Sequence, residues 1–368
     1  MKEIAQNGYT EAEILRVLRM ANGSREISFE YELLDKYDRR IGNLENITGS
    51  VSYASLTQIK GTASFDLAGK HQPEIDFLND RIKPYFILKM PDGGECKWPL
   101  GIFLLSSPDK DYKARRITAY DKTLILAQDK TQKRLVIPQG SNYINAVINL
   151  IGNAGIPQVD IPANEATLAY DKEFDINVSY ANIVNELLSA VNYTSLYFDE
   201  NGVAKAKPYT PPSQRAVELD YTDGEYSIMF EDATETEDYY EVPNVFVVTA
   251  SNPDMELPLS SIYVNDKPEN KLSTVSRGRR IVAHYELSDT ASQAALDAYA
   301  IRMAYEASQI YSKISFSTAL MPIHGYSDTL YISHPVLALP GVFSETRWEM
   351  ELKPGGRMKH EARRLVFV

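Results

Sequence analysis

The stretch from Arg277 to Ile332 reads "RGRRIVAHYELSDTASQAALDAYAIRMAYEASQIYSKISFSTALMPIHGYSDTLYI". Apolar and polar residues alternate from Ile281 to Tyr285, which predicts a strand. Residues 290–311 then repeat apolar side chains at helical spacing, with Thr290 and Gln293 placed as a capping box. The alternating pattern returns in "KISFSTA" and "DTLYI". The order is therefore strand, long helix, strand, strand.

Two further strands follow in "RWEMELKPGGRMKHEARRLVFV", residues 347–368, with the turn at Gly355-Gly356. Upstream, Val245–Val248 and Ile262–Val264 also read as strands. The C-terminal part, residues 211–368, is therefore predicted as a β-barrel domain that contains one long helix.

The N-terminal part, residues 1–134, also predicts a β domain. A short helix begins at Thr10, where Glu13 completes a capping box. Strands of period two follow from Arg25 onward, with turn residues such as Pro91-Asp92-Gly93-Gly94 between them. Several short strands at this spacing indicate a barrel or sandwich rather than a βαβ unit.

Residues 135–210 predict a small α+β insert. One helical stripe begins at Ser141 and closes at Gly155, and Ser179 caps a second helix. The loop containing Asn201-Gly202 then joins a hairpin. The fold class expected for the whole chain is mainly β, with two β-barrel domains and an α+β insert between them.

The composition excludes several function classes. The chain has 368 residues and a net charge of −12, whereas a protein that grips nucleic acid needs a basic footprint. A single cysteine, Cys96, rules out an internal disulfide framework and agrees with assembly in a reducing compartment, the cytoplasm. The N-terminus does not read as a signal peptide, and no apolar run reaches membrane-spanning length. The 24 tyrosines favour a β-rich protein that forms interfaces.

The sequence predicts no catalytic residues, no cofactor and no metal. The five histidines lack metal-binding spacing, and His360 alternates in phase with Met358, as a strand histidine facing a buried layer would. His324, Ser327 and Asp328 contain the residue types of a triad, but neighbours on one loop do not align in series. Motifs for acyl transfer, nucleotide hydrolysis and dinucleotide binding are missing from the sequence.

Two charged segments are candidate interaction surfaces. The acidic run "EDATETEDYYE" is predicted as a solvated loop, with calcium binding and a place on the lumen or rim of a channel as the other interpretations. Three nearby arginines are expected to face partners or neighbouring subunits. The residues are Glu231, Asp232, Glu235, Glu237, Asp238 and Glu241 in the acidic run, and Arg277, Arg279 and Arg280 in the basic one.

The C-terminal order of elements resembles the baseplate or tail-tip hub proteins of bacteriophage tails and related injection particles. "RRITAYDKTLIL" and "SYANIVNELLSAVNYTSLYFDENGVAKAKPY" are similar to that family's first barrel closure and middle insert. The chain departs from the family pattern at Ser327, because many members have glycine before the aspartate that corresponds to Asp328.

This resemblance implies a virion protein built of two tail-tube-like barrels. Three subunits would form a ring with pseudo-sixfold symmetry at the distal end of the tail, between the tail tube and the tip. The implied partners are the distal tail protein, the tape measure protein and tip or fibre proteins. Double-stranded DNA would pass through the ring without specific binding.

Two other function classes stay open from the sequence. A tail-associated peptidase or peptidoglycan hydrolase would need a catalytic domain after the last hub strand, and the sequence ends at Val368 without one. A carbohydrate-binding receptor module would need exposed Trp and Tyr clusters on loops. Trp98 and Trp348 instead lie in strand alternation, as core or interface residues do.

Overall fold

The structure is a computed structural model, and it describes residues 4–20, 23–68, 74–110, 114–211, 214–237, 240, 242–250, 259–308, 312–334 and 340–364. Strands dominate it, which confirms the mainly β fold class. The helices are α1 (Glu11–Leu18), α2 (Thr123–Gln128), α3 (Tyr143–Asn153), α4 (Tyr180–Ala190), α5 (Thr274–Arg277) and α6 (Gln293–Ser308).

The strands follow one another along the chain in four sheets. They are β1 (Glu26–Leu34), β2 (Arg40–Leu44), β3 (Ile47–Ala54), β4 (Gly61–Ala68), β5 (Arg81–Lys89), β6 (Glu95–Pro99), β7 (Phe103–Lys110), β8 (Ala114–Tyr120), β9 (Leu135–Ile137), β10 (Val159–Asp160), β11 (Lys172–Phe174), β12 (Tyr197–Phe198), β13 (Ala204–Lys205), β14 (Leu219–Thr222), β15 (Thr234–Glu237), β16 (Val245–Ala250), β17 (Leu259–Val264), β18 (Val282–Leu287), β19 (Ser312–Ala319), β20 (Thr329–Ser333), β21 (Gly341–Glu351) and β22 (Arg357–Arg364).

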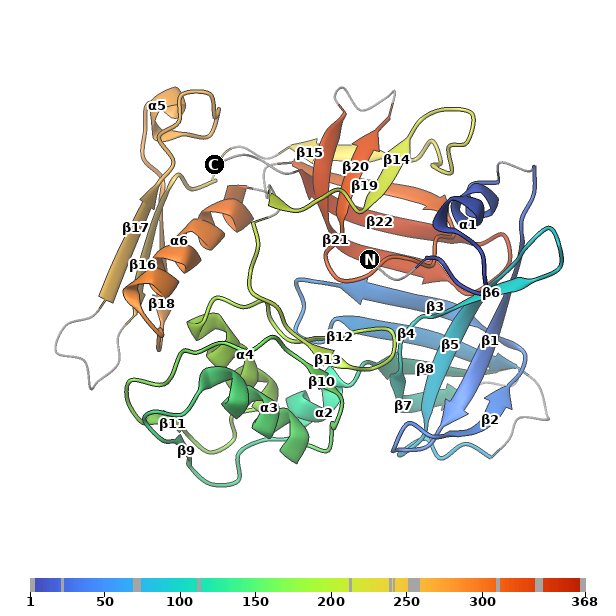
Figure 1. Ribbon diagram of the computed structural model, residues 1–368, viewed down its shortest axis with the longest axis horizontal. Helices are drawn as coiled ribbons and strands as arrows, with labels where there is room; N and C mark the ends of the chain where they lie inside the picture. The colour runs from blue at the N-terminus through green and yellow to red at the C-terminus, as the bar shows by residue number, and fades with distance from the viewer. Residues whose placement is uncertain are drawn as a thin grey trace.

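Strands from both ends of the chain form one large sheet. Its main path runs β15-β19-β22-β21-β3-β4-β8-β7-β5-β1-β2, with β6, β14 and β20 paired to its side. The two halves join where β21 pairs antiparallel with β3, so the red and blue strands of Figure 1 lie side by side. In the described part of the chain, these pairings form an open path and do not close into a barrel.

The core of this sheet draws on both halves of the sequence. It buries Phe65 and Phe86 from the first half together with Phe316 and Met358 from the second. Helix α1 packs Ile14, among others, into the same cluster. One continuous core makes the strands from the two ends of the chain a single packed body.

The predicted helix ends can be checked against the caps. The Thr10–Glu13 capping box at α1 is confirmed, and Ser179 caps α4 as predicted, because its side chain accepts from the Asn182 amide. The prediction that the first helix of the insert, α3, begins at Ser141 was wrong. Asn142 caps α3 instead, since its side chain accepts from the Asn145 amide.

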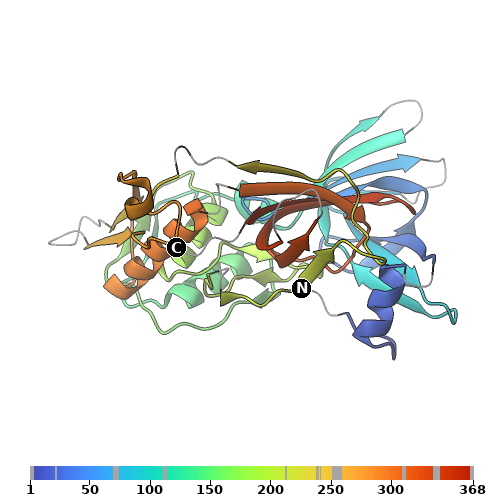
Figure 2. The same cartoon turned by 90° about the horizontal axis from the view of Figure 1, so that it is seen from above.

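The insert has its own core and a hairpin that reaches the large sheet. Helices α3 and α4 pack against each other in a cluster that includes Tyr143, Ile151 and Leu187. Strands β12 and β13 form the predicted hairpin, with Gly202 at φ +72 in its turn. Viewed from above, the insert and α6 occupy one end of an elongated molecule, and the large sheet with α1 occupies the other (Figure 2).

Residues 242–308 contain a further sheet with α6 against it. Strand β16 lies between β17, antiparallel, and β18, parallel, and α6 covers the face that buries Phe246 and Val248. The predicted capping box of Thr290 and Gln293 was wrong. The helix begins at Gln293, and the Ser292 hydroxyl accepts from the Ala295 amide at 3.1 Å. Residues 309–311, the predicted end of this helix, lie outside the described residues.

Candidate functional site

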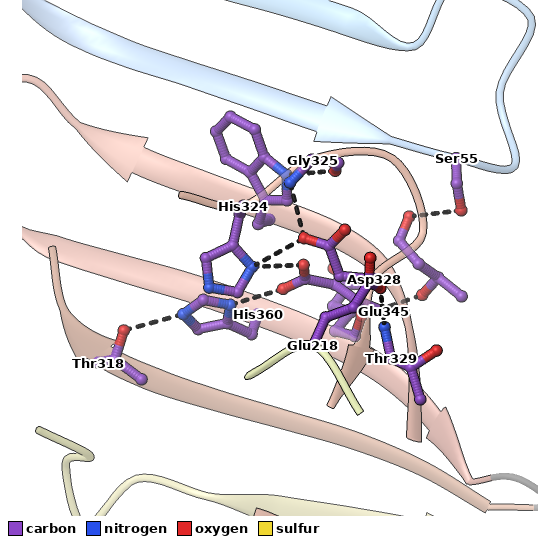
Figure 3. A network of polar contacts seen from close by, with 12 residues as sticks. Ser55, Glu218, Thr318, His324, Gly325, Asp328, Thr329, Glu345 and His360 are labelled. Carbon is purple, nitrogen blue, oxygen red and sulfur yellow. Dashed lines mark hydrogen bonds and ion pairs between the residues drawn. The ribbon is translucent and has the colours of Figure 1, made fainter. Parts of the chain in front are cut away.

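A buried polar network lies inside the C-terminal half of the large sheet. Its centre is the Glu345 carboxylate on β21, with His360 on β22 and His324 on the loop between β19 and β20 (Figure 3). Tyr221 from β14 and Thr318 from β19 complete it. Each of these side chains is at most 3% exposed, so each polar atom needs a protein partner.

Hydrogen bonds link the five side chains in one row. Glu345 contacts His324 Nδ1 through Oε2 at 2.6 Å, and His360 Nδ1 through Oε1 at 2.7 Å. At the two ends, Tyr221 Oη lies 2.6 Å from His324 Nε2, and Thr318 Oγ1 lies 2.9 Å from His360 Nε2. Every nitrogen of both imidazoles therefore has a partner.

The last bond in the row indicates where the protons are. The Thr318 hydroxyl donates to the carbonyl of Ala319 at 2.9 Å, so it is left to accept from His360 Nε2–H. A neutral His360 then presents a lone pair at Nδ1, and the Glu345 carboxyl must donate to it. His324 donates from Nδ1 to the other Glu345 oxygen and accepts from the Tyr221 hydroxyl. These five side chains therefore form a neutral network, and the Asp328 carboxylate lies 3.9 Å from His324 Nδ1.

The titration behaviour of the same groups agrees with this assignment. Burial raises the pKa of Glu345 from 4.5 to about 7, which favours the protonated carboxyl. Burial lowers the pKa of His360, which favours its neutral form, although the neighbouring Glu345 acts in the other direction. Burial also raises the pKa of Tyr221 well above 10, so this phenol keeps its proton.

A β-bulge directs Glu345 into the core. The pairing of β21 with β22 shifts register between Glu345 and Arg347, so that Thr346 is an extra residue. In a regular strand Glu345 would lie on the face opposite Trp348. The bulge reverses the phase and places both side chains inside.

The loop that carries His324 is held by its own polar contacts. The Asp328 carboxylate accepts from the Gly325 amide at 2.7 Å, and Trp348 Nε1 donates to the Gly325 carbonyl at 3.1 Å. The Glu218 carboxylate accepts from the Thr329 amide at 2.9 Å, which ties β14 to the start of β20. These contacts fix the position of His324 relative to Glu345.

The residue types of a hydrolytic triad do not assemble here. Ser327 Oγ lies 3.2 Å from the Ser344 hydroxyl, and both His324 nitrogens are taken by Glu345 and Tyr221. Ser327 has φ +54, the left-handed conformation that glycine adopts most easily. Serine replaces the glycine of the family pattern here, but the backbone at Ser327 keeps the conformation that glycine would adopt.

The donor set of the network includes the ligand types that zinc uses. One ligand atom from each of His324, Glu345 and His360 lies within 4.8 Å of the others, and all three residues are buried. At 2.6 and 2.7 Å, however, the nitrogen–oxygen contacts are hydrogen bonds, and the His324 lone pair at Nε2 accepts from Tyr221. The residues fit a hydrogen-bonded network as they stand, and a metal ion would have to break it.

An aromatic column connects the network to the insert. Trp348 stacks on Tyr53 at 6.0 Å between ring centroids, and Tyr53 meets Tyr326 edge to face at 6.2 Å. Tyr326 in turn stacks on Tyr197 of β12 at 4.2 Å, with the planes 6° apart. The loop of residues 320–328 therefore holds the buried network on one side and the insert hairpin on the other.

The acidic run is more ordered than a solvated loop. Residues 234–237 form β15, an edge strand that pairs with β19. Asp232 accepts from the Ser317 amide at 3.0 Å, and Glu235 accepts from the Ser312 hydroxyl at 2.7 Å. Glu231 and Glu237 are exposed, whereas Asp238 and Glu241 lie outside the described residues.

The predicted basic residues lie around α5. The Arg277 side chain donates to the carbonyls of Val242 and Tyr240, and the Arg279 guanidinium lies 5.7 Å from the Tyr240 ring centroid. Arg280 is exposed. Arg277 therefore has an internal role in holding α5 to the segment before β16.

Sequence reasoning missed most of the buried network. It placed His360 in phase with Met358, and both are buried. It had no signal for Glu345, because the bulge breaks the alternation, or for Tyr221, because β14 is only four residues long.

Cys96 is fully buried in β6, and burial raises the pKa of its thiol. None of the described helices is long and apolar enough to cross a bilayer.

Solved structures of phage tail proteins share this fold. A tail protein from Neisseria meningitidis superposes with a TM-score of 0.63 at 10% identity, over 91% of this chain and 96% of its own. The 43 kDa tail protein of prophage MuSo2 from Shewanella oneidensis gives 0.60 at 10%, over 91% and 98%. Prophage tail protein gp18 from Listeria monocytogenes gives 0.57 at 10%, over 91% and 94%. No protein-family model matches the sequence, and no curated protein matches it.

The fold of this chain is that of these three tail proteins. The resemblance seen in the sequence is therefore confirmed at the level of the fold. At 10% identity, the shared property is the arrangement of the elements along nearly the whole of each chain.

Proposed function

We propose that this protein is a structural subunit of a phage-type tail, in which three copies form a hub at the distal end. The observation that carries the proposal is the likeness to three tail proteins, each matched over at least 94% of its own length. A match of this extent includes the large sheet, the insert and the α6 unit together. The proposal places the protein in the virion after assembly in the host cytoplasm.

The two halves of the large sheet support the proposed threefold assembly. The strands before residue 121 and those after residue 218 contribute comparable sets to one continuous sheet. If each half takes the place of one tail-tube subunit, three chains match a sixfold tube. The hub would join the tail tube and the distal tail protein on one side to tip or fibre proteins on the other, with the tape measure protein and the DNA on its axis.

The charge of the chain suits a DNA channel. Carboxylates repel phosphates over a Debye length of about 8–10 Å, so an acidic lumen lets DNA pass without sticking. The chain carries a net charge of −12. We place the acidic run on the rim or lumen of the ring, with exposed Glu231 and Glu237 facing the axis and exposed Arg279 and Arg280 facing a partner.

The site geometry supports a non-enzymatic role over a hydrolase. Ser327 makes no contact with His324 that could activate it, since the histidine nitrogens contact Glu345 and Tyr221. A carbohydrate-binding role is also less well supported, because Trp98 and Trp348 are 2% and 4% exposed. The only two tryptophans are therefore unavailable as a sugar platform.

Three measurements test the proposal. Mass photometry of the purified protein, alone and with the distal tail protein, should give three copies per complex, and a labelled copy should appear at the tail tip by electron microscopy. A stable dimer, or six copies per particle, would contradict it.

Incubation with cell walls and with casein should give no turnover. Turnover that Ser327→Ala or His324→Ala abolishes would make the protein an enzyme.

A further inference from the structure

A polar cavity of about 420 Å³ lies where the insert, α6, the large sheet, and Tyr209 and Arg215 of the linker between insert and sheet meet. Four cationic side chains line it: the large sheet supplies two, and the linker and α6 supply one each. Only one carboxylate, Glu306, is in the described lining. The four cations are Lys60, Arg215, Arg302 and Arg363. In a chain with a net charge of −12, such a local excess of positive charge calls for a physical reason.

The charges are poorly neutralised by the protein itself. Arg302 donates to Glu306 at 2.8 Å and to the Tyr193 carbonyl at 2.8 Å, so the single carboxylate is already used. Arg215 donates to the carbonyls of Thr210 and Ser327, which are neutral groups. Among the residues that the structure describes, the Arg363 guanidinium has no hydrogen bond or ion pair, and the negative charges of Glu306 and Glu361 act on it only from a greater distance.

Lys60 is the most buried of the four cations. Lys60 is 3% exposed, and its ammonium donates to the carbonyls of Ser55 and Thr57 at 2.9 Å each. An ammonium has three N–H groups, so one remains for another acceptor. Burial lowers the pKa of Lys60 to about 8, and the negative charge of Asp121 opposes this only in part.

The cavity walls hold the guanidinium groups of Arg302 and Arg215 in place and fix the backbone of Arg363. Arg302 and Arg215 lie 4.6 and 5.8 Å from the centroid of the same Tyr209 ring. Arg363 extends from β22, where its backbone pairs with Ser344 of β21, and the Ser344 side chain also lines the cavity. Guanidinium groups fixed in this way recognise the paired oxygens of phosphate and carboxylate at a lower entropic cost.

We infer that this cavity is a binding site for a small oxyanion, a phosphate or a compact polycarboxylate. The ligand would contact Arg363 and Arg215, complete the coordination of the Lys60 ammonium, and lie beside the Arg302–Glu306 pair. A volume of about 420 Å³ accommodates an anion of this size together with several waters. Because the ligand would touch the large sheet, α6 and the linker at once, binding would also hold these parts together. The inference does not depend on the proposed place of the protein in a tail.

Titration calorimetry with the full chain tests this site, with inorganic phosphate and citrate as separate probes at constant ionic strength. We expect saturable binding of at least one of them with one site per chain, and a thermal midpoint that rises with its concentration. Arg363→Gln should weaken binding by about tenfold or more, and Arg363→Lys should restore part of it. Binding of phosphate alone would identify the ligand as a phosphate, and binding of citrate alone would identify it as a polycarboxylate.

Arg357→Gln is the matched control. Arg357 lies on the same strand, β22, and the substitution removes the same charge, but the residue is outside the cavity and pairs with Asp232 at 3.6 Å. We expect it to bind as the unchanged protein does, within about twofold. The inference is overturned if neither probe binds, if both substitutions weaken binding equally, or if short duplex DNA binds through Arg363 and competes with phosphate. Thermal unfolding without ligand verifies that each variant is folded.

Discussion

Trp348 of β21 lies directly opposite Tyr53 of β3, and their rings stack with planes 15° apart. Among the described strands, this pair stands at the only connection in the main sheet path between the N-terminal and C-terminal halves. Trp348 also donates to the Gly325 carbonyl, so one side chain contacts both the sheet junction and the loop of the buried network. The junction and the network are therefore mechanically linked.

Replacing Trp348 should destabilise both halves of the sheet. We expect Trp348→Ala to lower the free energy of unfolding by about 3–5 kcal/mol, because it leaves a large cavity and an unpaired Gly325 carbonyl. Urea denaturation followed by circular dichroism measures this change. Tyr37→Ala serves as a control, since Tyr37 is 67% exposed and should shift stability by less than about 0.5 kcal/mol. Equal effects of the two substitutions would show that the junction is unimportant.

The buried network should make stability depend on pH. The pKa of Glu345 is raised to about 7 in the folded protein, so the folded state binds more protons than the unfolded state between pH 4.5 and about 7. This contribution to stability is therefore present at low pH and is lost as the pH rises through about 7. The pKa of His360 is lowered, so its contribution is lost as the pH falls below 6.5.

Glu345→Gln isolates the first of these effects. Glutamine keeps the shape and a hydrogen-bonding amide but does not titrate. We expect the stability difference between the unchanged protein and this variant to decrease by about 1–3 kcal/mol from pH 5 to pH 8. Denaturation curves at four pH values measure it, with exposed Glu231→Gln as control. A difference that stays constant with pH would show that Glu345 is ionised throughout.

Metal ions should not stabilise this network. The lone pairs of His324, Glu345 and His360 are used in hydrogen bonds, so zinc would have to break two of them in a site with no exposed ligand. We expect the thermal midpoint to stay within about 1 °C when zinc or a chelator is added, since a specific site would raise it with concentration. Zinc that co-purifies at one ion per chain, and is lost in His360→Ala, would contradict the neutral network.

Gly49 occupies a position in β3 where a side chain has no room. It has φ +146, and a Cβ atom there would lie 1.9 Å from the backbone oxygen of Ser64 on β4. We expect Gly49→Ala to lower the free energy of unfolding by about 3 kcal/mol or more. Gly42→Ala is the matched control, because Gly42 is also in a strand of this sheet and has no atom within 4 Å of the Cβ position. Similar denaturation midpoints for the two variants would contradict this view of the β3–β4 contact.

The local parts of the fold were predictable because their signals are local. Thr10 with Glu13, Ser179, and the Asn201-Gly202 turn each act within four residues, and all three occur as predicted. The start of α6 was misplaced by the same reasoning, since Thr290 and Ser292 are equally good caps by residue type. The contact that decides between them, the Ser292 hydroxyl on the Ala295 amide, is visible only in three dimensions.

The candidate sites were less predictable because they depend on register and on distant segments. Glu345 faces the core only because Thr346 forms a bulge, which no alternation pattern contains. Lys60 and Arg363 are about three hundred residues apart in the sequence and line one cavity. Acidic composition also concealed this cavity, because a net charge says nothing about where single charges gather.

The aromatic contact between Tyr326 and Tyr197 should couple the insert to the large sheet. The insert and the large sheet each have their own core, so without good contacts between them they would unfold as separate units. The Tyr326 ring stacks on Tyr197 at 4.2 Å and meets Tyr53 on its other side, and it therefore bridges the two cores. We expect Tyr326→Ala to split thermal unfolding into two calorimetric transitions, with the insert melting first because its core is smaller. Tyr326→Phe keeps the ring and should unfold in the same number of transitions as the unchanged protein. If Tyr326→Ala unfolds with an unaltered profile, the coupling runs through other contacts, such as those around the polar cavity lined by Arg302 and Arg363.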